Sequence, residues 1–248
     1  MAPLLQIQSL SLSYHQPSGE TRALKDINLT VDKGQFVSIL GPSGCGKSTL
    51  LSAIAGLDRP SAGTIKLNSP AQTVGYMFQH DLLLEWRSVF QNACLGLEVR
   101  GALNDDSKAY VKVLLNAYGL GGFLHHKPSQ LSGGMRQRVA LVRTLALKPE
   151  LLLLDEPYSA LDYQTRLTVA DEIWRILRAS SKTAILVTHD ISEAICLGDR
   201  VIILSRRPGH IIEDMTIDFG SDRTPLGVRS LPAFQEYFKT IWEVMQHA

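Results

Sequence analysis

Hydrophobic and polar positions alternate along the chain with two different periods. Alternation with a period of two, or a compact run of aliphatic residues, predicts strands, and these fall at residues 4–14, 27–31, 35–40, 151–154, 183–187 and 201–204. Apolar residues spaced three and four apart predict helices at residues 47–55, 163–179 and 191–197. Because these helices alternate with strands, the pattern is typical of an α/β fold with a parallel sheet.

A run of helical patterns interrupts this α/β core. The letters SVFQ at 88–91 have the form of a capping box, which predicts a helix that continues to about residue 99. Helical patterns also cover residues 110–118 and 135–147, so residues 86–148 are predicted to form a helical insert. One face of the last predicted helix carries Phe234, Tyr237, Phe238, Ile241 and Met245. We expect this face to pack on the core.

The composition is that of an ordinary globular protein. The 248 residues, 45% of them hydrophobic, can bury a large core, and the formal net charge of +1 argues against the basic surface that binds nucleic acid. Neither a basic leader nor a run of about 18 apolar residues is found, so we expect any work at a membrane to be done from outside the bilayer. Cys45, Cys94 and Cys196 lack metal-site spacing and are expected to be free thiols.

The sequence GPSGCGKST matches the phosphate-loop pattern G-x-x-x-x-G-K-[ST], between a predicted strand and a predicted helix. Its glycines let backbone N–H groups converge on phosphate oxygens, Lys47 reaches the β and γ phosphates, and the Ser48 hydroxyl can bind Mg²⁺. The motif predicts a site for ATP and Mg²⁺, formed by Gly41, Pro42, Ser43, Gly44, Cys45, Gly46, Lys47, Ser48 and Thr49. The alternative is a glycine-rich turn that merely precedes a helix.

Two carboxylates follow the predicted strand at 151–154. Ligands of an open parallel sheet collect at the carboxyl ends of its strands, so Asp155 is expected near the phosphate loop, where it can hold Mg²⁺ directly or through water. The neighbouring Glu156 points another way and can take a proton from an attacking water as general base. The alternative is a solvated edge of the sheet.

Two other polar residues stand where predicted strands end. His189 is a candidate for contacting the γ-phosphate or ordering the attacking water, and the alternative is a turn or packing residue. Gln79, at the end of VGYMFQ, is a candidate for reaching Mg²⁺ and the attacking water, and the alternative is a polar strand terminus.

The letters LSGG at 131–134 predict a second place where an anion can bind. Ser132 can cap the helix that follows, while Gly133 and Gly134 let a ligand approach bare backbone, so free N–H groups and the positive end of the helix dipole point outward. The alternative is a turn that only starts a helix.

These motifs, in this order, resemble the ATP-binding subunit of an ABC transporter over nearly the whole chain. GPSGCGKST is similar to the Walker A motif, LLLLDE to Walker B, LSGG to the signature and SALD at 159–162 to the D-loop, while Gln79 and His189 match the Q-loop and H-loop. The resemblance implies a P-loop NTPase fold with a RecA-like core, an N-terminal antiparallel β region and an inserted helical subdomain. One domain would span 1–248, with residues 1–85 and 149–220 as the β region and core, 86–148 as the helical subdomain and 221–248 as a helical tail.

The resemblance also implies a homodimer that hydrolyses ATP. Two subunits pack head to tail in this family, so the phosphate loop of one subunit and residues 132–134 of the other would enclose each ATP, with Asp162 of the D-loop nearby. Tyr14 stands where the family places an aromatic residue against adenine, and the alternative is a strand tyrosine that faces the core. Met135 stands where many relatives have Gln, which removes one side chain able to bond the opposite nucleotide.

The finer resemblance is to the importer branch that serves nitrate, sulfonates, taurine and the pyrimidine precursor of thiamine. It rests on LSGGMRQRVAL, LDYQTRL and LSRRPGHI. It implies two transmembrane permease subunits, a separate solute-binding protein and a peripheral location on the cytoplasmic face of the inner membrane. Leu83, Leu84 and Trp86 would form the groove for a permease helix, although Glu85 stands where relatives often have Pro; the alternative is that they form the core of the insert.

Three other functions remain as alternatives. The first is the ATPase of an exporter or lipid-trafficking ABC complex. The second is a soluble ABC ATPase that acts on DNA or ribosomes, although such proteins usually carry two cassettes or a coiled-coil insert. The third is a small-molecule kinase, which shares the phosphate loop but has no need of LSGG or a D-loop.

Overall fold

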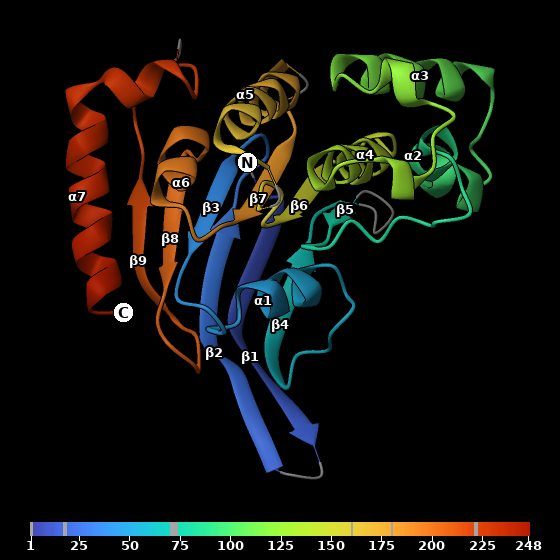
Figure 1. Ribbon diagram of the computed structural model, residues 1–248. Coiled ribbons are helices and arrows are strands. Elements are labelled where there is room, and N and C mark those ends of the chain that lie inside the picture. The colour runs from blue at the N-terminus through green and yellow to red at the C-terminus, as the bar shows by residue number, and fades with distance from the viewer. Residues whose placement is uncertain (1, 17–18, 70–73, 160, 180, 221–222) are drawn as a thin grey trace. The chain divides into compact units, whose positions relative to one another are not determined.

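The computed structural model describes residues 2–16, 19–69, 74–159, 161–179, 181–220 and 223–248. They form two compact units, one made of Met1–Ala71 with Ala170–Ala248 and the other of Gln72–Val169. Figure 1 shows the helices and strands of both units with their labels. Among the described residues, no helix has the length and apolar character needed to cross a lipid bilayer.

An antiparallel sheet begins the first unit. Its strands are β1 (Leu5–Gln16), β2 (Gly19–Val31) and β4 (Ala62–Leu67), in the order β2-β1-β4. The alternation predicted at the end of β2 is confirmed, because Ile27, Leu29 and Val31 are buried while Asn28 and Thr30 are exposed.

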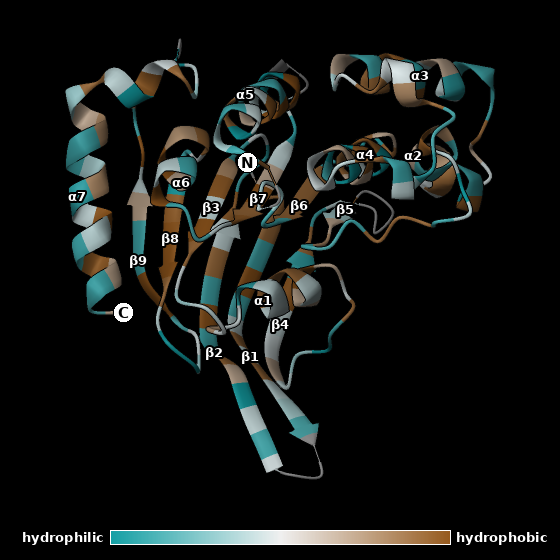
Figure 2. Ribbon diagram, in the orientation of Figure 1, coloured by the Kyte–Doolittle hydropathy of each residue, from teal (hydrophilic) through white to brown (hydrophobic). Residues whose placement is uncertain are grey.

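A mainly parallel group of strands follows in the same unit. β3 (Phe36–Leu40) lies between β7 (Thr183–Val187) and β8 (Arg200–Leu204), parallel to both, and β9 (Ile211–Thr216) pairs antiparallel with β8. Every residue of β3 and β7 is buried, which explains why both strands are apolar except for Ser38 and Thr183. Figure 2 shows brown, hydrophobic segments in these strands. Two helices follow these strands, α1 (Lys47–Ile54) after β3 and α6 (Ile191–Leu197) after β7.

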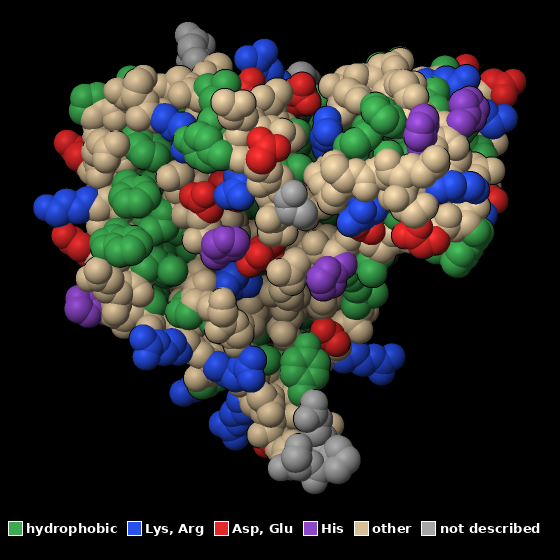
Figure 3. Space-filling view, in the orientation of Figure 1, with side chains coloured by type: hydrophobic (Ala, Val, Ile, Leu, Met, Phe, Trp, Pro, Cys, Tyr) green, Lys and Arg blue, Asp and Glu red, His purple; other side chains and the backbone are tan. Residues whose placement is uncertain are grey.

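The first unit ends with a short 3₁₀ helix, η4 (Gly227–Ser230), and the helix α7 (Pro232–Gln246). Phe234 and Ile241 of α7 are buried against α6 and β8, and Tyr237, Phe238 and Met245 pack beside them. The predicted apolar face of this helix is therefore confirmed. The aromatic residue Trp242 is 51% exposed, and Figure 3 shows hydrophobic side chains on the surface over α7.

The second unit contains all of the residues predicted to form the helical insert, 86–148. Its strands β5 (Val74–Met77) and β6 (Leu151–Asp155) are parallel, and its helices are α2 (Val89–Val99), α3 (Asp105–Ala117), α4 (Gly133–Leu145) and the 3₁₀ helices η2 (Gly121–Phe123) and η3 (Pro128–Gln130). The helix α5 (Tyr163–Ala179) begins in this unit and ends in the first. The capping box predicted at Ser88 and Gln91 is confirmed, since each side chain accepts the other's backbone N–H, at 3.2 and 2.9 Å.

The structure corrects several of the element predictions. The strand predicted at 27–31 is the end of β2, which begins eight residues earlier, at Gly19. The helix predicted at 110–118 starts five residues earlier, because Asn104 and Ser107 form a capping box of their own. Strands β4 and β9 were absent from the prediction. Both are edge strands without a fully buried residue, so they lack the buried alternation by which strands are recognised. The three cysteines are buried free thiols, as predicted.

Candidate functional site

The phosphate loop lies between β3 and α1 and has the curled backbone that its sequence predicts. Gly44 and Gly46 have φ angles of +75° and +111°, which other residues rarely adopt. A Cβ on Gly46 would also lie 2.7 Å from Leu24 Cδ2 and 2.9 Å from the Ala23 carbonyl. The glycines are therefore needed for this loop to form against β2.

Lys47 holds its ammonium group inside the loop. The side chain is 7% exposed, and its Nζ donates to the carbonyl oxygens of Gly41 at 2.7 Å and Pro42 at 3.0 Å. A buried cation surrounded by curled backbone is suited to an anion with several oxygens. The next residue, Ser48, is exposed and its hydroxyl is accessible to a ligand.

Tyr14, on β1, is 37% exposed, so the alternative in which it faces the core is wrong. Its hydroxyl donates to Asp58 Oδ2 at 3.0 Å and lies 3.4 Å from the hydroxyl of Thr49, at the start of α1. Partial burial raises the pKa of Tyr14. These contacts hold the ring on the same side of the unit as the phosphate loop's helix.

His189 lies on a well-fixed turn after β7. The hydroxyl of Thr188 donates to Glu193 Oε2 at 2.6 Å and accepts the N–H of Asp190 at 3.0 Å. The Asp190 carboxylate in turn caps α6 by accepting backbone N–H groups. His189 itself is exposed, which contradicts the packing alternative and leaves its imidazole accessible from solvent.

In the second unit, the structure brings Gln79 and Glu156 together. Asp155 ends β6 with 4% exposure and accepts the hydroxyl of Tyr76 at 3.4 Å, while the Gln79 amide donates to Glu156 Oε2 at 3.3 Å. Glu156 has a φ of +46°, a strained conformation for a residue with a side chain. Such strain lowers the stability of the fold and is found most often at functional sites, where the surrounding structure holds the residue in place.

The signature segment caps its helix as predicted. Ser132 is the N-cap of α4, and its hydroxyl accepts the backbone N–H of Met135 at 3.3 Å. Gly133 and Gly134 form the first turn and are half-buried. Asp162 caps α5 in a similar way by accepting the N–H of Thr165 at 3.0 Å. Hydrogen bonds from the Thr165 side chain and, less strongly, from its backbone N–H lower the pKa of Asp162. Of the other D-loop letters, Ala160 lies outside the described residues.

The segment after Gln79 is largely accessible. Leu82 is 55% and Trp86 72% exposed, whereas Leu83 and Leu84 are half-buried. The alternative that this segment forms the core of the insert is therefore wrong for Trp86. Arg143 of α4 donates to the carbonyls of Leu82 and Asp81, which ties the segment to the signature helix.

Magnesium ligands were predicted at Ser48, Gln79 and Asp155. Ser48 belongs to the first unit, and Gln79 and Asp155 belong to the second. All three supply the oxygen atoms that Mg²⁺ prefers, and Asp155 is a buried carboxylate at a strand end. Among the described residues, no group of three or more His, Cys, Asp or Glu side chains could hold a metal by itself.

One contact of the phosphate loop was not predicted. The guanidinium of Arg207, in the connection from β8 to β9, donates to the carbonyl of Gly44 at 2.9 Å. The two residues are 163 positions apart, and the letters LSRRPGHI around Arg207 carry a family resemblance but no sign of this contact. Spacing along the chain holds no information about this contact, which depends on the fold.

Comparison with known proteins identifies the family. Residues 24–159 match the family model described as "ABC transporter". The uncharacterized ABC transporter ATP-binding protein YtlC of Bacillus subtilis is 45% identical over 245 residues, 96% of this chain and 94% of that protein. The taurine import ATP-binding protein TauB of Yersinia pestis is 45% identical over 203 residues, 80% of each chain.

A solved structure shares the fold. It is a dimeric structure of a post-hydrolysis state of the ATP-binding cassette MJ0796 bound to ADP and Pi, with a TM-score of 0.78 and 31% identity over 87% of this chain and all of that one. The predicted fold class, a P-loop NTPase with an inserted helical subdomain, is confirmed by this similarity. The chain therefore belongs to the ABC transporter family and has the fold of its ATP-binding cassettes.

Proposed function

We propose that this protein is the ATP-binding and ATP-hydrolysing subunit of an ABC importer for a small nutrient solute. The observation that carries the proposal is the phosphate loop, whose curled glycines surround the buried ammonium of Lys47. Residues 41–49 bind the phosphates of ATP, and Tyr14 stacks on the adenine. This use of Tyr14 is supported by its exposed ring and by its anchoring to Asp58.

Mg²⁺ accompanies ATP in the proposed site. Ser48, Gln79 and Asp155 hold it, directly or through water, and their oxygen atoms fit a hard cation. The bound ion neutralises charge on the phosphates. This assignment is supported by the burial of Asp155 at the carboxyl end of β6, where ligands of an open sheet collect.

Glu156 takes a proton from the attacking water as general base. Its carboxylate accepts the amide of Gln79, so the two side chains are oriented together. His189 orders the water or contacts the γ-phosphate from its fixed turn after β7. The strained backbone of Glu156 supports a catalytic rather than a structural assignment.

Two copies of the chain act as a head-to-tail homodimer. Ser132, Gly133 and Gly134 of one subunit, together with Asp162, complete the ATP site on the phosphate loop of the other. Backbone N–H groups at the start of α4 stabilise the charge that develops on the γ-phosphate. The dimeric structure of the similar cassette MJ0796 supports this arrangement.

The dimer works beneath two transmembrane permease subunits and with a separate solute-binding protein, as a peripheral protein on the cytoplasmic face of the inner membrane. The solute belongs to the class of nitrate, sulfonates, taurine or the pyrimidine precursor of thiamine, which is supported by the similarity to TauB. Leu83, Leu84 and Trp86 receive a helix of the permease, and the exposure of Trp86 supports this use.

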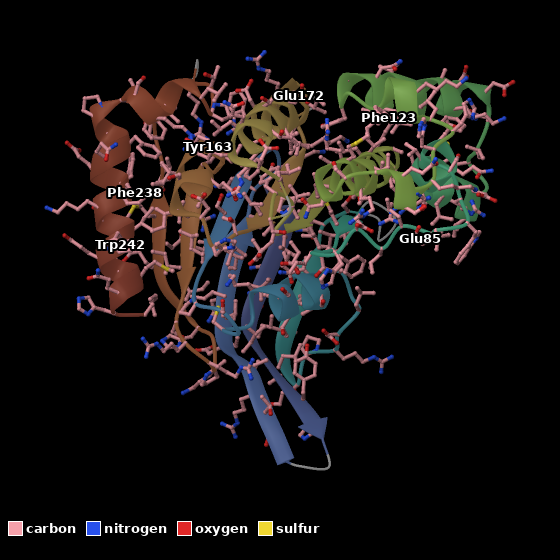
Figure 4. The ribbon with its side chains drawn as sticks, in the orientation of Figure 1. Glu85, Phe123, Tyr163, Glu172, Phe238 and Trp242 are labelled. Carbon is pink, nitrogen blue, oxygen red and sulfur yellow. The ribbon has the colours of Figure 1, made fainter. Side chains whose placement is uncertain are left out.

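The test is purification of the tagged chain from detergent-solubilised membranes of its own host. We expect the wild-type chain to bring down two membrane subunits and Trp86→Ala to lose them. Trp242→Ala is the matched control, because Trp242 is also exposed but lies on α7 in the other unit. Figure 4 labels Trp242 and Phe238 on α7, and it labels Glu85, the residue before Trp86 in the sequence. Recovery with ribosomes or DNA in place of membrane subunits would contradict the importer assignment. Equal recovery of the membrane subunits by both variants would contradict the placement of the permease helix at Trp86.

A further inference from the structure

The connection between β8 and β9 runs against the phosphate loop and is itself firmly anchored. Gly209 donates its N–H to the Ala23 carbonyl and accepts the N–H of Lys25, both at 2.9 Å, so the connection is joined to β2 by backbone hydrogen bonds. A Cβ on Gly209 would lie 2.2 Å from the Cys45 carbonyl oxygen. The connection therefore lies in close contact with the phosphate loop, and its hydrogen bonds to β2 keep it there.

Arg207 extends from this anchored connection to the middle of the loop. Its Nε donates to the Gly44 carbonyl at 2.9 Å, and its Nη2 lies 3.5 Å from the point where a Gly44 side chain would begin. The positive charge of Arg207 also acts on the loop electrostatically. Burial raises the pKa of the Cys45 thiol, and Lys47 and Arg207 both oppose that rise.

The peptide between Gly44 and Cys45 is held from both directions. In a trans peptide the C=O and N–H groups point opposite ways. Arg207 holds the C=O of Gly44, and the N–H of Cys45 donates to the Pro42 carbonyl at 3.3 Å. Since Gly44 and Gly46 have the freedom of glycine on either side, a loop without such a restraint would sample other conformations and lose entropy on binding phosphate.

We propose that Arg207 is a positioning residue for nucleotide binding, which holds the phosphate loop in its phosphate-binding conformation through the Gly44 carbonyl. The inference rests on the proposed function, because it assumes that the loop binds ATP. Arg207 acts on the loop and not on the reacting atoms. Its loss should therefore weaken ATP and ADP binding alike and leave the chemical step unchanged.

The experiment compares Arg207→Ala, Arg207→Lys and Arg206→Ala in the full-length protein. Arg206 is the matched control, because it is the adjacent arginine and its side chain is exposed. We expect Arg207→Ala to raise Kd for Mg-ATP and Mg-ADP about three- to tenfold and to raise KM with kcat nearly constant. This is less than the full effect of a charge-assisted hydrogen bond, because the Arg207 side chain is exposed to solvent and acts on the nucleotide only through the loop. Arg207→Lys keeps a donor and a charge and should recover most of the affinity. Arg206→Ala should match the wild type.

Two further measurements separate the possible failures. Thermal unfolding without nucleotide shows whether Arg207→Ala is folded; a variant with unchanged Tm and unchanged Kd would overturn the proposal, as would a loss of kcat with constant KM. If Arg207→Ala has a lower Tm, Arg207→Lys decides between the two roles. For a positioning role, Arg207→Lys should recover most of the nucleotide affinity. For a purely structural role, its Kd should follow its Tm, as for any other variant of the same stability. Lys47→Ala is measured alongside. If Lys47→Ala binds ATP normally, the proposed function fails. If Lys47→Ala loses affinity but Arg207→Ala binds ATP normally, only the positioning role fails.

Discussion

The chain has two glycine-rich helix starts, and they are built differently. The phosphate loop before α1 ends at Gly46, which has no side chain to cap the helix, and its glycines have positive φ angles. The start of α4 is capped by Ser132, whose hydroxyl already accepts the N–H of Met135. The start of α1 thus leaves its backbone N–H groups for a ligand, whereas at the start of α4 the Ser132 hydroxyl already accepts one of them.

The two helix starts also differ in the charged side chains around them. The phosphate loop encloses the buried ammonium of Lys47 and is held from outside by Arg207. At the start of α4, Met135 follows the two glycines, and the nearby Arg136 is bonded to Asp81 and to the Leu131 carbonyl. The phosphate loop is a complete anion site, whereas the signature segment can only supplement another one. This difference favours a site shared between two subunits.

The largest effect is expected for Glu156→Gln, which keeps the size of the side chain but removes the base. Loss of general-base catalysis costs roughly 10² to 10⁴ in rate. Lys47, Ser48 and Asp155 remain, so ATP should still bind and the variant should accumulate as an ATP-bound dimer. Light scattering after size-exclusion chromatography, with Mg-ATP or Mg-ADP, measures this, and ADP should not support the dimer.

Adding Ser132→Arg to that variant tests where the second helix start lies. A bulky side chain there should block the face that meets the partner's nucleotide and return the protein to monomers. A dimer that forms equally well with ADP, or that survives the added Arg, would contradict the placement of α4 opposite the phosphate loop.

The next effect is that of Lys47→Ala on affinity. Charge-assisted hydrogen bonds contribute about 1.5–3 kcal/mol each, so we expect Kd for Mg-ATP to rise roughly 10- to 100-fold. Titration calorimetry measures the change, with the exposed Lys33→Ala as control. Equal affinities for the two variants would mean that the phosphate loop is not a complete anion site.

Substitutions of Ser132 separate its capping role from a ligand role. Ser132→Ala should lower the free energy of unfolding of the second unit by about 1 kcal/mol, the usual cost of losing an N-cap. Ser132→Asp keeps the cap, because its carboxylate accepts the same N–H, but places negative charge where a phosphate would lie. We expect near-normal stability and strongly reduced ATPase activity. Normal activity would confine Ser132 to capping.

The sequence predicted local features well and long-range contacts poorly. The capping box at Ser88 and Gln91 was found because its letters are three residues apart and act within one helix turn. The start of α3 was missed because its capping box uses Ser107 in place of Glu or Gln. The exposure of Trp86 was left open, since burial depends on neighbours that sequence does not specify.

The candidate site shows the same division. The conformation of the phosphate loop follows from its own glycines, so its motif predicts its shape. The bond from Arg207 to Gly44 joins residues 163 positions apart and exists only because the turn after β8 is tied to β2 at Gly209. Likewise, the bond between Gln79 and Glu156 depends on the parallel pairing of β5 with β6, which places both strand ends at one edge.

The smallest effect is expected at Tyr14, where the ring and the hydroxyl can be tested separately. Tyr14→Phe keeps the ring but removes the hydroxyl contacts with Asp58 and Thr49, so we expect Kd for Mg-ATP to rise no more than about threefold. Tyr14→Ala removes the stacking surface as well and should have the larger effect, with kcat almost unchanged, because stacking stabilises ground and transition states alike. Fluorescent-nucleotide titration and steady-state kinetics measure both. Because the phosphate loop supplies most of the binding free energy, both effects should stay below that of Lys47→Ala; a fall in kcat at constant affinity would show that Tyr14 does not contact adenine.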